Sequence, residues 1–411
     1  MARIEFKQLG HAYAARGQSQ EANRAAGANG ANGNARPLSD YALQPMSMEW
    51  QDGGAYALLG PSGCGKSTLL NIISGLLVPS EGQVLFNGVD VTRMPTRERN
   101  IAQVFQFPVL YDTMSVFDNL AFPLRNRKLP EAQVKARVHE VAEMLDLSAD
   151  LKLRASGLAA DAKQKISLGR GLVRQDVAAI LFDEPLTVID PHMKWQLRQK
   201  LKQIHQHLKI TMIYVTHDQV EALTFADEVV VMTNGKVVQK GRPEALFEQP
   251  DHSFVGFFIG SPGMNFFPVK LEERAISIAG QRMALDSGIS ASLAGRLDKE
   301  QASEQLSSGG MADGQLSDAQ FDRLQAAQGE LKLGIRPEFV TLADPGSAGS
   351  VAAEVVRIQN LGTCQLVTAV FGEQVIKARL DPAQAIALGP QAFHLLQPQS
   401  IFFCNDERIG R

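Results

Sequence analysis

Nine residues near position 60 constrain the fold more than any other segment of this chain. They read Gly60-Pro61-Ser62-Gly63-Cys64-Gly65-Lys66-Ser67-Thr68. This run matches the phosphate-binding-loop pattern G-x-x-x-x-G-K-[ST]. The apolar residues 56–59 before it predict a strand, and residues 68–73 after it predict a helix. Because the backbone N–H groups of such a loop and the start of its helix cradle phosphates, the sequence predicts a nucleotide site on an α/β fold.

Two side chains of the loop have expected roles of their own. Lys66 is expected to reach the β- and γ-phosphates of a bound nucleotide, and Ser67 to supply a hydroxyl to Mg²⁺. The other loop residues up to Thr68 are expected to contact the nucleotide as well. The sequence therefore indicates MgATP as the ligand of this loop.

Two further predicted strands end in polar residues. The strand 179–182 leads into Asp183 and Glu184. Since ligands of parallel sheets bind outside the carboxyl ends of the strands, Asp183 is expected to hold Mg²⁺, and Glu184 to orient or deprotonate the attacking water. The strand 212–215 leads to His217, which we expect at the same edge, in contact with the γ-phosphate.

The chain divides into two parts by sequence pattern. Residues 1–241 alternate short apolar strands with helices, which predicts a largely parallel sheet. Residues 97–175 are expected to form a helical subdomain, and the first 14 residues an edge strand. Residues 242–411 predict linking helices up to about 260 and then a small β-barrel domain with a regulatory or dimer-stabilising role. Polar, low-complexity stretches predict two insertions, at 15–38 and about 286–330.

Composition excludes several classes of protein. The 41 Lys and Arg residues nearly balance 44 Asp and Glu, which leaves a net charge of -3 and no basic footprint for nucleic acid. The three cysteines are too few for a disulfide framework. No apolar run approaches the roughly 20 residues that span a bilayer. These features predict a cytoplasmic protein that does not itself cross a membrane.

Together these motifs resemble the nucleotide-binding subunit of ABC transporters. Gln106, after Val104 and Phe105, is similar to the family's Q-loop glutamine, and Asp190 to the aspartate of its D-loop. Tyr13 stands where the family has an aromatic residue that stacks on adenine. Residues 258–266 and 333–338 resemble the C-terminal domain of sugar-importer ATPases.

The resemblance implies a fold, a reaction and partners. The fold is an α/β P-loop ATPase core with a helical subdomain, followed by a barrel-like domain of the OB/TOBE type. The reaction is hydrolysis of ATP with Mg²⁺, in which Glu184, His217 and Gln106 are catalytic and Ser67, Gln106 and Asp183 hold the metal.

Family architecture further implies a second ATPase subunit, bound head to tail, and two transmembrane permeases whose coupling helix meets residues 107–111. A periplasmic or lipid-anchored solute-binding protein acts indirectly. The expected location is the cytoplasmic face of the inner membrane. The resemblance implies a carbohydrate or polyol as cargo. Within this class the chain resembles most specifically one of the two ATPases of bacterial glycerol importers, so glycerol is a candidate cargo.

One segment departs from the family pattern. Where the family has Leu-Ser-Gly-Gly-Gln, residues 158–162 read Leu-Ala-Ala-Asp-Ala. Ala159 replaces a hydroxyl, and Asp161 brings a carboxylate to a helix N-terminus, where it either caps its own helix or repels a phosphate. The intact motifs beside this degenerate signature suggest one half of an asymmetric heterodimer. The alternatives are a catalytically weak regulatory subunit and a non-transport ABC ATPase.

Overall fold

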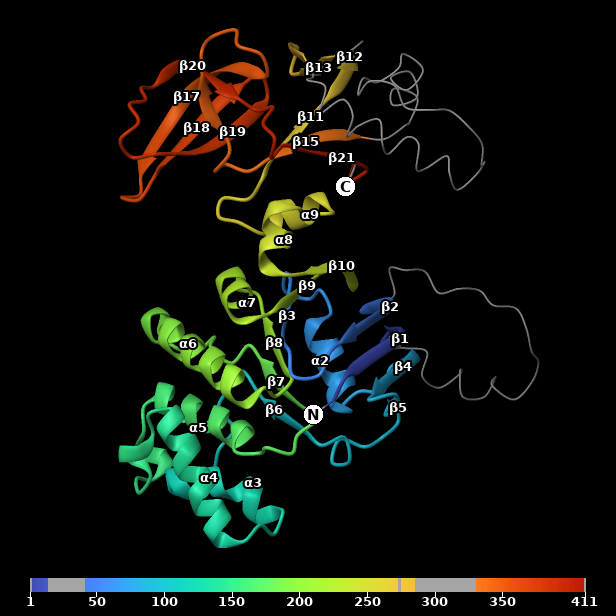
Figure 1. Cartoon of the computed structure of the whole chain (residues 1–411), viewed down its shortest axis with the longest axis vertical. Coiled ribbons are helices and arrows are strands. Elements are labelled where there is room, and N and C mark those ends of the chain that lie inside the picture. Colours follow the sequence, from blue (N-terminus) through green and yellow to red (C-terminus); the bar gives the residue numbers. More distant parts are fainter. Residues whose placement is uncertain (1, 14–40, 273–274, 285–329, 410–411) are drawn as a thin grey trace, which may run out of the picture. The chain divides into compact units, whose positions relative to one another are not determined.

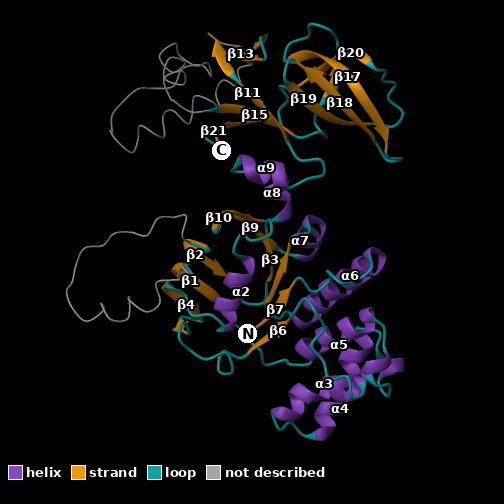
Figure 2. Cartoon of the chain, turned by 180° about the vertical axis from the view of Figure 1, so that it is seen from behind, coloured by secondary structure: helices purple, strands orange, loops and turns teal. Residues whose placement is uncertain are grey.

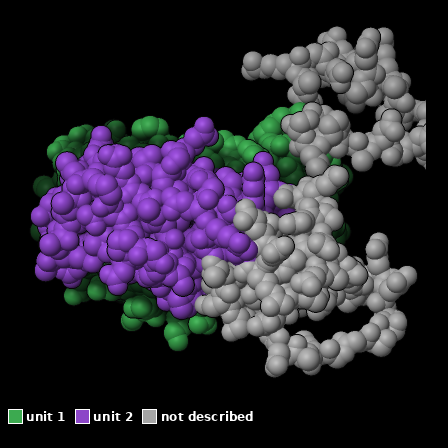
Figure 3. All heavy atoms as spheres, turned by 90° about the horizontal axis from the view of Figure 1, so that it is seen from above, with its two compact units in different colours: residues 1–243 green, residues 244–411 purple. Residues whose placement is uncertain are grey.

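The computed structural model describes residues 2–13, 41–272, 275–284 and 330–409 (Figure 1). The predicted insertion at 15–38 lies outside the described residues, as does all but the last residue of the one at 286–330. The chain forms two compact units, Met1–Pro243 and Glu244–Arg411, which are coloured separately in Figure 3.

A six-stranded sheet forms the centre of the first unit. Its strands, in spatial order, are β10 (Lys236–Gly241), β9 (Glu228–Thr233), β3 (Ala55–Leu59), β8 (Met212–Thr216), β7 (Ala179–Asp183) and β6 (Ile101–Val104). All neighbours pair in parallel except β9 and β10, which form an antiparallel hairpin. Every residue of β3 and β8 is buried, as expected for strands covered on both faces.

A second sheet, of four antiparallel strands, lies beside the first. Its order is β2 (Leu43–Trp50), β1 (Ile4–His11), β4 (Glu81–Phe86) and β5 (Val89–Asp90). The predicted edge position of the first strand is wrong, because β1 pairs with β2 on one side and β4 on the other. A shared hydrophobic core contains side chains of both sheets and of the helix α2 (Lys66–Ser74).

The described helices of the first unit fall into three groups (Figure 2). α2 lies between the two sheets, whereas α6 (Pro191–Leu208) and α7 (Gln219–Phe225) cover the opposite face of the central sheet. The expected helical subdomain consists of α3 (Val116–Asn126), α4 (Glu131–Met144) and α5 (Ala160–Leu172). Short 3-10 turns at Ser148–Asp150 and Ala155–Gly157 connect α4 to α5.

The second unit begins with two short helices and continues as β-structure. The helices are α8 (Pro243–Glu248), whose first residue belongs to the first unit, and α9 (Ser253–Phe258). The largest sheet has the order β16 (Thr341–Ala343), β20 (Gly389–His394), β17 (Ser350–Asn360), β18 (Gln365–Phe371) and β19 (Gln374–Leu380). It curls in the manner of a half barrel (Figure 1), which agrees with the expected β-domain, and its hydrophobic core also contains side chains of the other strands of this unit.

Two smaller antiparallel sheets complete this unit. One consists of β11 (Asn265–Pro268), β15 (Leu331–Ile335), β21 (Ile401–Cys404) and β22 (Glu407–Arg408). The other consists of β12 (Lys270–Glu272), β13 (Ala275–Ile278) and β14 (Gln281–Ala284). Within the described residues of both units, no helix combines the length and apolar character needed to cross a bilayer.

Candidate active site

Four of the predicted motifs lie at one edge of the central sheet. The strands β3, β8, β7 and β6 are consecutive neighbours and run in parallel, so their carboxyl ends meet at that edge. The phosphate-binding loop follows β3, and His217 follows β8 by one residue. Glu184 follows β7, which ends in Asp183, and Gln106 lies two residues after β6. The strand order thus brings together residues more than 150 positions apart.

The conformation of the phosphate-binding loop requires glycine. Gly65 precedes α2 with a φ of 101°, and a Cβ there would lie 2.6 Å from the carbonyl oxygen of Ala42. A Cβ on Gly60 would overlap the carbonyl oxygen of Met232. At these two glycines the loop packs so closely on neighbouring backbone that a side chain is excluded, which suits a backbone cradle for phosphate.

The side chain of Lys66 lies in the curve of this loop. Its ammonium donates hydrogen bonds to the carbonyl oxygens of Gly60, at 2.7 Å, and Pro61, at 2.9 Å. Cys64 is also buried there, and burial raises the pKa of its thiol. Lys66 is 5% exposed, so the loop holds a buried positive charge where phosphate oxygens would be bound.

Part of the phosphate-binding loop is open to solvent, and Tyr13 lies beside it. Pro61, Ser62, Gly63 and Ser67 are exposed, and Thr68 is half-buried. The hydroxyl of Tyr13 lies 3.3 Å from the Thr68 hydroxyl, and the exposed Tyr13 ring packs edge-on against His11. Tyr13 thus stands beside the first turn of α2.

Glu184 and His217 are in direct contact. His217 Nδ1 lies 3.1 Å from Glu184 Oε1, and the Thr187 hydroxyl donates to Glu184 Oε2 at 3.2 Å. The backbone of Glu184 adopts a φ of 46°, and its N–H donates to the carbonyl oxygen of Val215. A left-handed conformation is uncommon for a residue other than glycine and is frequently found at functional sites.

The acidic pair suits a divalent cation. Burial raises the pKa of the Asp183 carboxyl, the neighbouring Glu184 carboxylate raises it further, and Lys66 lowers it. A carboxylate held in a half-buried position beside a second one is stabilised when a cation binds. Carboxylate, hydroxyl and amide oxygens are the donors that Mg²⁺ prefers, so Asp183, Ser67 and Gln106 fit this metal.

Asp190 has a local structural partner in addition to its expected role. Its Oδ1 accepts a hydrogen bond from the N–H of His192 at 2.9 Å, and Pro191 occupies the first turn of α6. Asp190 therefore caps α6, which fixes where the chain turns after the acidic pair.

Residues 158–162, which we expect at the position of the family signature, lie at the start of α5. Ala159 is the residue that caps this helix, and no side chain accepts a hydrogen bond at that cap within the described chain. The capping role considered for Asp161 is therefore wrong: Asp161 is the second helical residue and lies in the first turn. Its carboxylate does lie at the helix N-terminus, where it interacts favourably with the helix dipole.

The residues after Gln106 expose apolar side chains. Phe107 is 67% exposed and Val109 53% exposed. Asn119 holds the backbone of Tyr111 through two hydrogen bonds, and the guanidinium of Arg170 lies 4.8 Å from the Tyr111 ring centroid. The segment thus presents apolar side chains on a fixed backbone.

The sequence interpretation missed a buried carboxylate behind His217. Glu221 lies in α7, is 3% exposed and accepts hydrogen bonds from the hydroxyls of Tyr214 and Thr216. The available signal was its spacing, since Glu221 follows His217 by four residues, about one helical turn.

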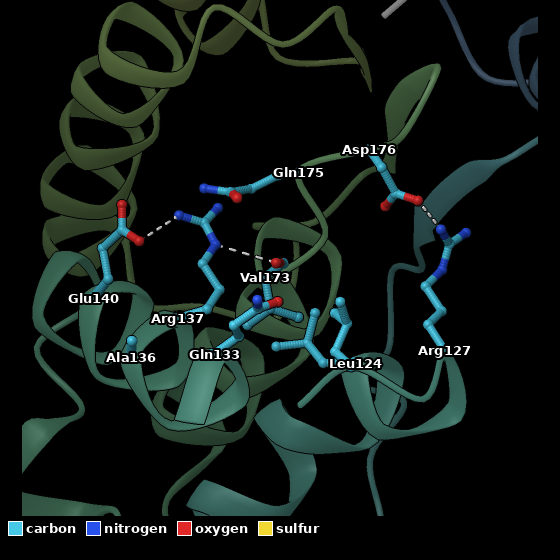
Figure 4. Close-up of a pocket in the computed structure, with 10 residues that line it drawn as sticks. Leu124, Arg127, Gln133, Ala136, Arg137, Glu140, Val173, Gln175 and Asp176 are labelled. Carbon is cyan, nitrogen blue, oxygen red and sulfur yellow. Dashed lines mark hydrogen bonds and ion pairs between the residues drawn. The ribbon is translucent and has the colours of Figure 1, made fainter. Parts of the chain in front are cut away.

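A cavity of about 600 Å³ lies away from this edge, between α3, α4 and the residues after α5 (Figure 4). Its charged groups pair with one another: Arg137 with Glu140, at 2.8 Å, and Arg127 with Asp176. The predicted site residues are absent from its lining, so this cavity is separate from the candidate active site.

Comparisons with known proteins show the family of this chain. Residues 43–187 match the family model described as "ABC transporter". The chain is 36% identical over 362 residues to an sn-glycerol-3-phosphate import ATP-binding protein of Escherichia coli K12, covering 88% of this chain and 92% of that protein. A protein of the same name from Yersinia enterocolitica is 35% identical over 368 residues, covering 89% of this chain and 93% of that protein.

A solved structure shares the fold of the first unit's core. CbiO1 of Clostridium perfringens, part of the ABC transporter complex CbiONQ, superposes with a TM-score of 0.51 at 26% identity, covering 60% of this chain and 90% of that one. The match over nearly the full length of the curated relatives is sufficient to assign the family. This chain belongs to the ABC transporter family, as one of its ATP-hydrolysing, ATP-binding subunits.

Proposed function

We propose that the chain is the motor subunit of a bacterial importer, located peripherally at the cytoplasmic face of the inner membrane. The observation that carries this proposal is the meeting of Lys66, Glu184 and His217 at one sheet edge, in a chain 36% identical to an import ATP-binding protein. The exposed apolar residues after Gln106 suit the coupling helix of a permease.

The proposed reaction is hydrolysis of the γ-phosphate of ATP. The N–H groups of the loop and the Lys66 ammonium bind the phosphate oxygens, and Tyr13 supplies a ring for the adenine. The oxygen of a water molecule attacks the γ-phosphorus while the Glu184 carboxylate accepts a proton from that water. The bond between the γ-phosphorus and the β–γ bridging oxygen breaks, so that ADP and inorganic phosphate leave, and His217 donates a hydrogen bond to a γ-phosphate oxygen. Ser67, Asp183 and Gln106 would hold Mg²⁺, which neutralises developing charge when bound.

The substitution Glu184→Gln in the assembled transporter tests this role. Loss of a general base lowers rates by roughly 10²–10⁴-fold, so ATP hydrolysis and uptake should fall at least hundredfold while ATP still binds. Glu143→Gln, the same change on an exposed residue of α4, serves as the control. Unchanged hydrolysis in Glu184→Gln would overturn the proposal and favour a regulatory subunit.

For the cargo, we infer a polyol or its phosphate ester, with sn-glycerol 3-phosphate as the first candidate. The names of the relatives from two organisms support this choice. Uptake of labelled sn-glycerol 3-phosphate and of glycerol should be compared in cells that express the full transporter. Strict dependence of one uptake on this chain supports the inference, and independence of both contradicts it.

We also propose that the chain pairs with a second ATPase subunit that has an intact signature. Ala159 offers no hydroxyl at the start of α5, and the Asp161 carboxylate occupies the helix end that would otherwise serve a phosphate of the partner's ATP. Two negative groups at one helix end repel each other. The active site would then combine this chain's Lys66, Glu184 and His217 with the partner's signature.

Restoring the signature tests the asymmetry. The double substitution Ala159→Ser and Asp161→Gly should raise ATP hydrolysis in a transporter whose other site is silenced by Glu184→Gln in this chain. The gain would come from the site that this chain's own signature faces. No gain in that background would contradict the repulsion argument.

A further inference from the structure

We propose that Glu221 is a positioning residue that orients His217 toward Glu184. The inference rests on the proposed role of His217 in hydrolysis and deepens it. It assigns a purpose to a buried carboxylate that contacts neither the phosphate-binding loop nor the acidic pair directly.

Glu221 acts through the residue immediately before His217. Its Oε2 accepts a hydrogen bond from the Thr216 hydroxyl at 2.8 Å and from the Tyr214 hydroxyl at 3.1 Å. Both hydrogen bonds are buried and have a charged acceptor, so they are stronger than hydrogen bonds between neutral groups. They therefore hold the Thr216 and Tyr214 hydroxyls in one orientation. Glu221, in α7, therefore fixes the position of the last residues of β8.

The residue after His217 is held by the same group of contacts. The Thr216 hydroxyl accepts a hydrogen bond from the N–H of Asp218 at 3.0 Å. The Asp218 carboxylate then caps α7 by accepting from the N–H groups of Val220, at 2.8 Å, and Glu221, at 3.2 Å. Because both flanking residues are fixed, the His217 side chain is directed to Glu184, 3.1 Å away.

The second oxygen of Glu221 faces the helix that begins at the D-loop. Glu221 Oε1 lies 3.9 Å from Lys194 Nζ in α6, and Asp190 caps that helix. The carboxylate thus links α7, which follows His217, to α6, which follows the D-loop residue Asp190. A buried carboxylate is costly unless its oxygens accept hydrogen bonds or face a cation. Here one oxygen accepts from two hydroxyls of β8, and the other faces the Lys194 ammonium in α6.

Two substitutions on either side of the same hydrogen bond test the proposal in the assembled transporter. Glu221→Gln weakens the bond, and Thr216→Val removes the hydroxyl. Each should lower kcat about tenfold, the loss expected for one charge-assisted hydrogen bond expressed in the transition state, with KM for ATP little changed. Thr216→Ser keeps the hydroxyl and should retain activity, and Glu143→Gln controls for loss of a carboxylate.

The double variant separates positioning from general damage. If Glu221 acts only through Thr216, the double variant Glu221→Gln with Thr216→Val should be no less active than the less active of the two single variants. Additive losses, or a kcat near that of the unaltered protein in both single variants, would overturn the inference. His217→Ala should also lose activity; if it does not, the proposed role of His217 fails first and the role of Glu221 with it.

Discussion

The substitution Gly65→Ala tests whether the loop geometry is responsible for ATP binding. Gly65 has a φ of 101°, and an added Cβ would lie 2.6 Å from the Ala42 carbonyl oxygen. Both features belong to the backbone, so no side-chain rotation relieves them. The loop or the start of β2 must move by several tenths of an ångström.

Two costs combine in this variant. A left-handed conformation costs a residue with a Cβ about 1–2 kcal/mol, and overpacking adds about 1–3 kcal/mol. A displacement of the phosphate cradle is the more serious effect, because it disturbs several phosphate contacts at once. We expect the Kd for ATP to rise roughly a hundredfold, which corresponds to about 2.7 kcal/mol. At an ATP concentration of 100 times Kd, the stabilisation by ATP would fall from about 2.7 to about 0.4 kcal/mol.

Thermal unfolding with and without MgATP measures both effects. Gly65→Ala should lower Tm and remove most of the increase that ATP causes. Gly88→Ala is the matched control, because Gly88 also has a positive φ, 80°, but an added Cβ has open space around it. Gly88→Ala should therefore lose stability while keeping the response to ATP. An ATP response in Gly65→Ala equal to that of the unaltered protein would refute the geometric reasoning.

Three further substitutions have defined outcomes. Arg99 donates to four backbone carbonyls, two of them at the end of α2. Arg99→Met should therefore lower the free energy of unfolding by about 1.5–3 kcal/mol or more in a denaturant titration. The exposed Arg97→Met should change it by under about 0.5 kcal/mol. Because the pKa of Asp183 is raised, Mg²⁺-dependent ATP binding should weaken on acidification at a higher pH than an ordinary aspartate would cause, and Asp183→Asn should abolish that dependence in a binding titration. Arg336 is 1% exposed and donates to carbonyls of α8 and Ile259, so Arg336→Met should lower the Tm of the second unit and leave ATP binding unchanged.

The phosphate-binding loop was predictable because its residues are contiguous and its flanking strand and helix are local. The nine residues 60–68 are enough to predict the loop, the start of the helix after it and the place of Lys66 beside the phosphates. The meeting of the loop with His217 at one edge required a general rule about parallel sheets, which the pairing of β3 with β8 satisfies.

Features that depend on pairing partners distant in sequence were not predictable. The alternation in residues 4–11 indicates a strand but not how many neighbours it has, and β1 proved internal. Glu221 was missed for a different reason: its partners Tyr214 and Thr216 are only seven and five residues away, but the sequence does not show that α7 folds back on β8 and buries this carboxylate. The cap of α5 was misassigned because helix starts in sequence are uncertain by a residue or two.

The most direct test of the account is the rate of ATP hydrolysis by the isolated chain, compared with the rate after mixing it with the proposed partner, a second ATPase subunit with an intact signature. With Lys66, Glu184 and His217 assembled but Ala159 and Asp161 in the signature, the account predicts little hydrolysis by the chain alone and a strong increase on mixing. Substantial hydrolysis by the isolated chain would contradict it.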